Sequence, residues 1–291
     1  MESPFHCVLA AQAVLGESPV WAVDEQALYW ADINGRSLNR FDPAHGVNTR
    51  WELPEVIGAF ALRAQGGFLL ALRSGLWFAD TQGTLQRQAI PAPYETSTHR
   101  FNDGRVDSRG RFWVGSMNEK RDAATGALYR VDPDLTLTRV IDGVMISNGL
   151  AFSRDDRVLY HADTHMRTIN AYAFDAQSAA LSVKREFYHG AAENDRPDGA
   201  AVDREGNYWC AFYRGGLVRQ IAPDGSVLRE IPVPAKCPTM CAFGGADLRT
   251  LYVTSARQFR PPEELAELPD SGGIFALRVE VPGLPEPKFL G

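Results

Sequence analysis

The chain has 291 residues, of which 45% are hydrophobic and 23% are charged, and its formal net charge is −6. These values are ordinary for a folded globular protein that is long enough to bury a large core. A negative chain has no general attraction to nucleic acid or to an anionic membrane, so we expect neither as a partner. No stretch approaches the ~20 apolar residues of a membrane helix, and the N-terminus lacks a basic leader, so we expect a cytoplasmic protein.

The four cysteines match no zinc template. Cys237 and Cys241 are separated by three residues and have no histidine close in sequence, and Cys7 and Cys210 lie far from both. We therefore expect reduced thiols.

Internal repeats predict the architecture. Short runs rich in Val, Leu, Tyr, Phe and Trp alternate with Gly, Asp, Asn and Pro, which is typical of strands and turns. Residues 106–113 and 202–209 carry the same Val-Asp-x-x-Gly-x-aromatic-Trp phrase, 96 residues apart, or twice 48. Six strand aromatics mark units that are 39 to 48 residues apart: Tyr29, Phe68, Phe112, Tyr160, Tyr208 and Tyr252.

Units of this length that hold several short strands are typical of propeller blades. The sequence therefore predicts an all-β fold, a six-bladed β-propeller that forms one domain over residues 1–291. We expect residues 7–13 to complete the last blade beside residues 273–279, which would protect the sheet edges. The alternative is a pair of β-sandwiches, which would give two halves rather than six matching units.

Oxygen-bearing side chains recur where the innermost strand of each unit begins. Four units contribute one each, namely Glu17, Asp103, Asn148 and Asp198, while Gly58 and residues 240–242 occupy this position in the other two. The innermost strands surround the channel, so these side chains should converge there and suit a hard divalent cation. Alternatively, Asn-Gly and Asp-Gly are turn dipeptides, although their common register in separate repeats favours a site.

Other polar residues give weaker signals. Arg100 and Asn102 point into the channel if the strand begins there, or Arg100 is a solvated charge. The charged loop 116–122 is either a rim over the pocket or an ordinary exposed loop. His161 and His165 lie in a strand-turn context and are not expected to be ligands. No serine-nucleophile elbow, zincin motif or phosphate loop is present in the sequence.

Several motifs resemble the family of senescence marker protein (regucalcin), gluconolactonase and luciferin-regenerating enzyme. They are Gly-Glu-Ser-Pro at 16–19, Arg-Phe-Asn-Asp-Gly at 100–104, Ser-Asn-Gly-Leu at 147–150 and Pro-Asp-Gly at 197–199. They run in order along nearly the whole chain. The resemblance implies a six-bladed propeller with one divalent metal held by Glu17, Asn148 and Asp198.

The resemblance also implies roles for individual residues. Asp198 would be the catalytic base as well as a ligand, Arg100 and Asn102 would bind the substrate, and Asp103 is not a usual ligand. Many relatives carry two acidic residues in the loop that here reads Asn118-Glu119-Lys120. The substrate contact from this loop therefore falls to Glu119 or to the reversed charge of Lys120.

Together these features predict a metal-dependent sugar lactonase that hydrolyses an aldono-lactone to the aldonic acid. The cation could be calcium, zinc, manganese, magnesium or iron(II), because oxygen ligands with water admit each of them. One alternative is a non-enzymatic calcium-binding regulatory or scaffold propeller. Another is an esterase or organophosphate hydrolase of the same fold. The particular sugar lactone and the oligomeric state are not predicted.

Overall fold

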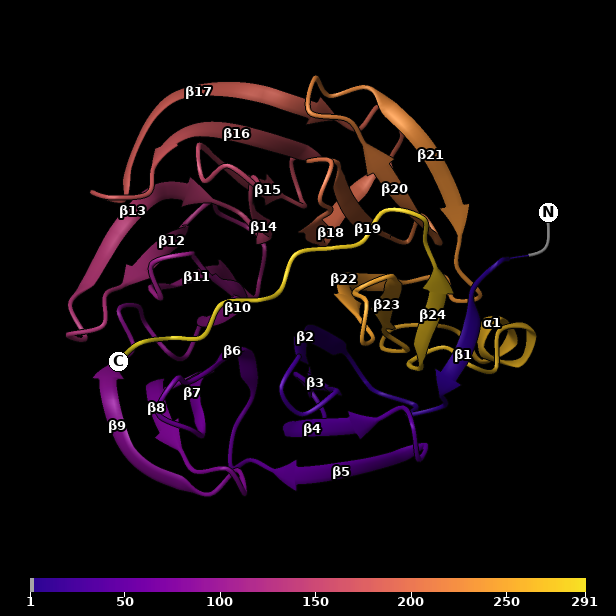
Figure 1. The fold of residues 1–291 in the computed structure, drawn as a ribbon, viewed down its shortest axis with the longest axis horizontal. Coiled ribbons are helices and arrows are strands. Elements are labelled where there is room, and N and C mark those ends of the chain that lie inside the picture. The colour runs from indigo at the N-terminus through magenta and orange to yellow at the C-terminus, as the bar shows by residue number, and fades with distance from the viewer. Residues whose placement is uncertain (1–2) are drawn as a thin grey trace.

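The computed structural model describes residues 3–291, and their strands form six four-stranded antiparallel sheets arranged as blades around one axis (Figure 1). In blades one to five the strands run in chain order, with the first strand innermost. The first blade contains β2 (Gly16–Ala22), β3 (Ala27–Asp32), β4 (Ser37–Asp42) and β5 (Val47–Glu52). The second contains β6 (Ile57–Leu62), β7 (Phe68–Leu72), β8 (Gly75–Ala79) and β9 (Leu85–Pro91).

The remaining blades follow the same plan. The third contains β10 (His99–Val106), β11 (Phe112–Asn118), β12 (Gly126–Val131) and β13 (Leu137–Val144). The fourth contains β14 (Ser147–Phe152), β15 (Val158–Asp163), β16 (Thr168–Asp175) and β17 (Ala180–His189). The fifth contains β18 (Arg196–Val202), β19 (Tyr208–Tyr213), β20 (Leu217–Ile221) and β21 (Val227–Pro232). The sixth contains β22 (Pro238–Gly244), β23 (Thr250–Ser255), β24 (Ile274–Arg278) and the N-terminal strand β1 (His6–Leu9), with helix α1 (Pro262–Glu267) between β23 and β24.

The N-terminal strand closes the ring, as the sequence predicted. β1 pairs antiparallel with β24, placing His6 opposite Ala276 and Cys7 opposite Phe275. This outermost strand of the sixth blade comes from the other end of the chain, so both chain ends are tied into one sheet. The observed strand is shorter than the predicted segment 7–13 and begins one residue earlier.

Burial follows from the stacking of the blades. Every residue of β3 is buried, whereas the outer strand β5 of the same blade is largely exposed. Inner strands are covered on both faces by neighbouring blades, so they carry nearly continuous apolar sequence. The six aromatics that marked the repeat units are all buried and all lie on the second strand of their blade, from Tyr29 on β3 to Tyr252 on β23.

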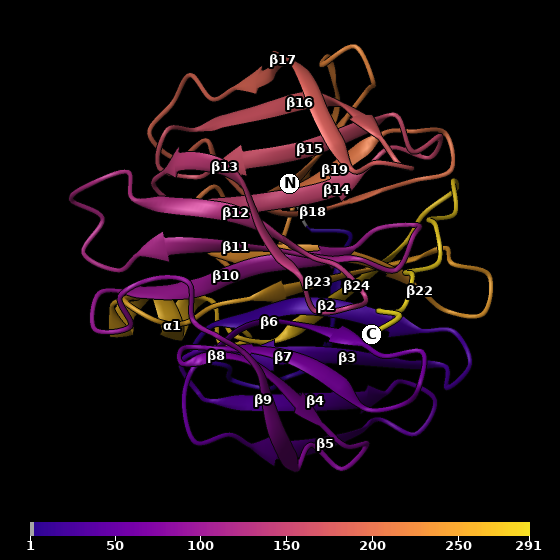
Figure 2. The ribbon, with the colours of Figure 1, turned by 90° about the vertical axis from the view of Figure 1, so that its left-hand side faces the viewer.

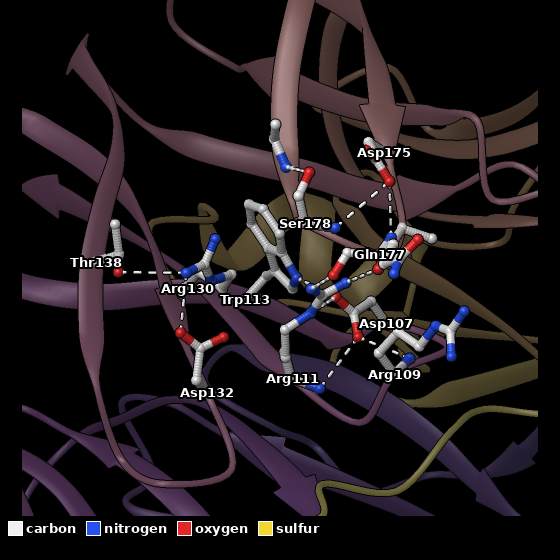
Figure 3. Close-up of polar contacts among 12 residues, drawn as sticks. Asp107, Arg109, Arg111, Trp113, Arg130, Asp132, Thr138, Asp175, Gln177 and Ser178 are labelled. Carbon is white, nitrogen blue, oxygen red and sulfur yellow. Dashed lines mark hydrogen bonds and ion pairs between the residues drawn. The ribbon is translucent and has the colours of Figure 1, made fainter.

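The repeated Val-Asp phrase has a structural role. Asp107 accepts hydrogen bonds from the backbone N–H of Arg109 (2.9 Å) and Arg111 (3.1 Å), and from the Trp113 indole Nε1 (2.8 Å), as Figure 3 shows. The Arg111 Nε also donates to it, at 2.6 Å. One buried carboxylate therefore satisfies the donors of a tight hairpin and anchors a core tryptophan.

The fifth blade repeats this arrangement. Asp203 accepts from the backbone N–H of Glu205 and Asn207, both at 2.9 Å, and from Nε1 of Trp209 at 2.8 Å. The phrase therefore encodes the hairpin between the first two strands of a blade, at the end remote from residues 100 and 198.

The C-terminal segment 280–291 crosses one face of the ring (Figure 1, yellow), and Figure 2 shows it on the opposite face from α1. The backbone of Phe289 forms an isolated parallel β-bridge with that of Arg63. The side chain of Phe289 is fully buried in the core between the second and third blades. Glu286 forms an ion pair with Arg105. The segment thus holds several blades together from outside the sheets.

Arg105 lies across the channel beneath this segment. It projects from β10, and its guanidinium donates to the carbonyl of Leu150 on β14 and to that of Ala200 on β18. One buried side chain therefore links the innermost strands of three successive blades and obstructs the channel on the C-terminal side.

The structure bears on two further expectations. All four cysteines are free thiols, three of them buried and Cys7 partly so. Within residues 3–291 the chain forms no helix with the length and apolar character needed to cross a membrane.

Candidate active site at the channel mouth

A cavity of about 240 Å³ is lined in part by Gln258 and Phe259, which lie in the segment that leads into α1. Five of the seven predicted site residues line it: Glu17, Arg100, Asn102, Asn148 and Asp198. All five are buried, and they come from the innermost strands of four different blades. The structure therefore brings together side chains separated by up to 181 residues (198 − 17).

Asp32 on β3 and Asp163 on β15 each accept a hydrogen bond from the backbone just before the inner strand of their blade. Asp32 accepts from the backbone N–H of Leu15 at 2.9 Å, two residues before Glu17. Asp163 accepts in the same way from Ile146 at 3.3 Å, two residues before Asn148. These equivalent anchors place the two polar side chains at matching positions in the first and fourth blades.

A β-bulge in the inner strands determines which residue faces the cavity. The residue after Glu17 is Ser18, and the residue after Asn148 is Gly149; both lie in the bulge with positive φ, at 49° and 60°. In the third blade the residue with positive φ is Asp103, at 28°, so Asn102 is the equivalent of Glu17.

The predicted alignment of Asp103 with the other ring residues is therefore corrected by one position. Asp103 does not line the cavity; its Oδ2 accepts from the backbone N–H of Leu150 at 2.9 Å. The bulge occurs in all four of these inner strands, so it does not set the third blade apart. The prediction matched Asp103-Gly104 to Asn148-Gly149 and Asp198-Gly199, but in the third blade this dipeptide lies one residue later in the strand. The third blade consequently presents an amide, rather than a carboxylate, at the ring.

The amide of Asn148 is held on both sides. Its Nδ2 donates to Oγ1 of Thr164 at 2.7 Å, while its Oδ1 accepts from Nδ2 of Asn102 at 2.8 Å. Thr164 in turn donates to the carbonyl of Pro197 at 2.6 Å, next to Asp198. This chain fixes the direction of the Asn148 oxygen and ties it to the strand that carries Asp198.

Arg100 is buried and positioned by its own strand. Its Nη1 donates to the Phe101 carbonyl at 2.8 Å and to Oδ1 of Asn102 at 2.7 Å. Glu119 lies 3.6 Å from the Arg100 Nε and 2.7 Å from Nη1 of Arg73. Glu119 therefore lies between Arg73 and Arg100 and helps to position the Arg100 guanidinium.

Neither Glu119 nor Lys120 lines the cavity, and Lys120 is exposed. Their contact with substrate stays a prediction.

Two buried carboxylates, Glu17 and Asp198, line the cavity, and neither forms an ion pair within residues 3–291, although the charge of Arg100 lowers the pKa of each. Burial raises the pKa of Glu17 to about 8, and the charge of Asp103 adds to this rise. Burial also raises the pKa of Asp198 well above its usual value, with further contributions from Glu17 and Asp103. The Asp198 Oδ1 is buried and has no hydrogen-bond partner. Such a pair strongly favours a proton or a cation between its members.

The donor set fits a hard divalent cation. Glu17, Asn148 and Asp198 offer oxygen atoms only, and the unpartnered Asp198 oxygen is free to coordinate. No group of three His, Cys, Asp or Glu side chains converges anywhere in residues 3–291, so the neutral amide oxygen of Asn148 would complete this ligand set. A cation would also lower the raised pKa values of both carboxylates.

Several cavity residues were not found from the sequence. Loops supply most of them: Arg121, Thr164, His165, Arg196, Tyr213, Arg214, Gln258 and Phe259. These positions differ in each repeat, so no shared phrase marks them; only the charge of loop 116–122 gave a signal, and Arg121 shows that this loop does form part of the rim. His161, by contrast, is buried outside the cavity, 2.7 Å from the Ser147 Oγ, and burial lowers its pKa to about 4.

The fold and the site define a six-bladed propeller with buried carboxylate and amide side chains at one mouth of its channel. The chain belongs to the SMP-30/gluconolactonase/LRE-like family, whose sequence profile matches residues 15–257. Both the predicted family and the predicted fold are thereby confirmed.

Three relatives illustrate the similarity. The chain is 48% identical over the full length of both proteins to a 6-deoxy-6-sulfogluconolactonase from Pseudomonas putida. It is 35% identical to regucalcin from Danio rerio, over 98% of each chain. A crystal structure of a calcium-binding regucalcin from Agrobacterium tumefaciens superposes with a TM-score of 0.93 at 29% identity, covering 97% of this chain and 96% of that one.

Proposed function

We propose that the protein is a metal-dependent sugar lactonase that converts an aldono-lactone to the aldonic acid. The observation that carries this proposal is the buried Glu17–Asp198 pair beside Arg100, with one Asp198 oxygen unpartnered. The full-length 48% identity to a sugar lactonase supports the enzyme class. Perturbed carboxylates in a cleft are the expected signature of acid–base chemistry.

Glu17, Asn148 and Asp198 would hold one divalent cation through oxygen atoms. When bound, such an ion polarises the lactone carbonyl and makes a nearby water more acidic. The oxygen set suits calcium, magnesium and manganese, and zinc or iron(II) with added waters. Arg100 and Asn102, which line the same cavity, would hold the substrate.

The chain's own groups account for the proton transfers. Asp198 would accept a proton from the attacking water as its oxygen bonds to the carbonyl carbon. The Arg100 guanidinium supplies positive charge near the oxygen that becomes negative. The ring C–O bond then breaks, and the proton passes from Asp198 to the departing ring oxygen. The product is an open-chain hydroxy acid, and Asp198 returns to its starting state.

A lactone panel tests the proposal. Gluconolactone and 6-deoxy-6-sulfogluconolactone, chosen because the Pseudomonas relative is named for the latter, are assayed for acid release with and without a chelator. We expect rapid turnover that the chelator abolishes, and Asp198→Ala should remove it. The control Asp134→Ala, in an exposed turn, should retain it.

The opposite outcomes are equally clear. Inertness toward every lactone together with tight calcium binding would favour the non-enzymatic regulatory propeller. Full activity of Asp198→Ala would remove this residue from the mechanism.

A further inference from the structure

The outer wall of the cavity carries three arginines in addition to the buried Arg100. Arg121 lies in the connection between β11 and β12, Arg196 begins β18, and Arg214 follows β19. They come from the third and fifth blades, and all three line the same cavity as Glu17 and Asp198.

These three guanidinium groups are poorly matched by negative charge. Within residues 3–291, Arg121 and Arg214 make neither a side-chain hydrogen bond nor an ion pair. Arg196 donates to the Glu193 carbonyl at 3.0 Å and lies 3.7 Å from its carboxylate, which is 82% exposed. All three arginines line one cavity of about 240 Å³, so their like charges lie near enough to repel.

The acids on the floor of the cavity do not balance this charge. Glu17 and Asp198 are the two carboxylates that line the cavity, and the proposed cation binds both of them. With the cation in place, four arginines and one metal ion surround the substrate. A neutral sugar leaves that excess unmatched, whereas an oxyanion can accept several charge-assisted hydrogen bonds from planar guanidinium groups.

The position of the arginines indicates which end of the substrate bears the anion. The reacting carbonyl must reach the floor, at Asp198, while Arg121 is exposed and Arg214 half-buried toward the mouth. An anion at the lactone end would also compete for the metal, so it belongs at the other end.

We propose that Arg121, Arg196 and Arg214 form an oxyanion subsite for a sulfonate or phosphate group carried by the sugar lactone at the end remote from its carbonyl. This inference rests on the proposed lactonase function and adds the chemical class of its substrate. It makes the three arginines determinants of specificity that act on binding.

The test is a ratio of specificities. The kcat/KM of wild type is measured for gluconolactone and for its 6-sulfonate and 6-phosphate analogues, and compared with that of Arg214→Gln, Arg121→Gln and the double variant. We expect each single variant to lower the anionic-to-neutral ratio about tenfold and the double variant about a hundredfold. The analogue whose kcat/KM falls further in the variants identifies the preferred oxyanion.

A matched control lies in the same blade. Arg109, in the hairpin at the opposite end of β10 and β11, is exposed (Figure 3). Arg109→Gln should keep the wild-type ratio, and a comparable fall in this variant would assign the effect to net charge alone.

The outcomes separate the two proposals. If lactones are hydrolysed but the double variant keeps the wild-type ratio, the subsite is overturned and the lactonase stands. If no lactone is hydrolysed, calorimetry measures the affinities for 6-phosphogluconate and gluconate and tests the subsite without catalysis. Preference for the phosphorylated acid that is lost in the double variant supports the subsite, and equal binding of the two acids overturns it.

Discussion

Asn102 donates from Nδ2 to Oδ1 of Asn148 at 2.8 Å, across the boundary between the third and fourth blades. Both are buried, and each lies immediately before a bulge residue of its inner strand. The repeated architecture thus places two amides in contact, one in the proposed ligand set and one beside it. Their contact makes the ligand geometry depend on packing between blades.

We predict that Asn102→Ala weakens the binding of calcium by roughly ten- to a hundredfold, because Asn148 loses the donor that orients its oxygen. Isothermal titration calorimetry on metal-free protein measures this change. Asn170→Ala, on the outer part of the fourth blade, serves as the control and should bind as wild type does. Unchanged affinity in Asn102→Ala would show that Asn148 is not a ligand or does not need this support.

We predict that calcium binding releases protons near neutral pH. The pKa of Glu17 is raised to about 8, so Glu17 of the metal-free protein holds a proton at pH 6.5, and burial shifts the pKa of Asp198 in the same direction. A bound cation favours the carboxylate forms, so calcium affinity should rise with pH up to about 8 and then level off. Calorimetry in two buffers with different ionisation enthalpies counts the protons.

Glu17→Gln removes one titrating group and provides the comparison. It should bind calcium more weakly and release fewer protons at pH 6.5. Equal heats in the two buffers for the wild-type protein would contradict the raised pKa values.

We predict that Asp107→Ala lowers the free energy of unfolding by about 3 to 5 kcal/mol. The substitution leaves Arg111, the Trp113 indole and two hairpin N–H groups without their buried acceptor (Figure 3). Urea denaturation measures the loss. Asp134→Ala, which removes an exposed turn carboxylate, should change stability by less than about 1 kcal/mol. Similar losses in both variants would show that the buried hydrogen bonds of Asp107 do not stabilise the fold.

We predict that Phe289→Ala destabilises the protein by about 3 to 5 kcal/mol, because a fully buried ring is lost from the core between two blades. The neighbouring Leu290, 51% exposed, is the matched control, and Leu290→Ala should cost less than about 1 kcal/mol. Thermal unfolding of both variants measures the difference. Equal unfolding midpoints would mean that the buried Phe289 ring does not stabilise the propeller.

The repeated parts of the molecule could be predicted, because each blade solves the same packing problem. Tyr29 and its five counterparts are buried at equivalent positions, so their spacing revealed the blades. Glu17, Asn148 and Asp198 were found for the same reason. Asp103 was placed one position off because its Asp-Gly dipeptide imitates Asn148-Gly149 and Asp198-Gly199 but lies one residue later in the inner strand.

The unrepeated parts could not be predicted in this way. Arg121, Arg196 and Arg214 line one cavity only because the third and fifth blades converge at the mouth of the channel. Segment 280–291 contains three prolines and no strand-like alternation, and its path depends on the packing of Phe289 into the core between the second and third blades. Such contacts are set by the assembled ring and leave no local pattern in the chain.

The guanidinium of Arg105, bonded to strands of two other blades, gives the channel a blind end. A molecule that reaches Asp198 must therefore leave by the route through which it came, past the same arginines. Ring opening adds a carboxylate to the substrate. On the proposed function, the arginines would therefore hold the acid product more tightly than the lactone, and product release would limit the turnover rate.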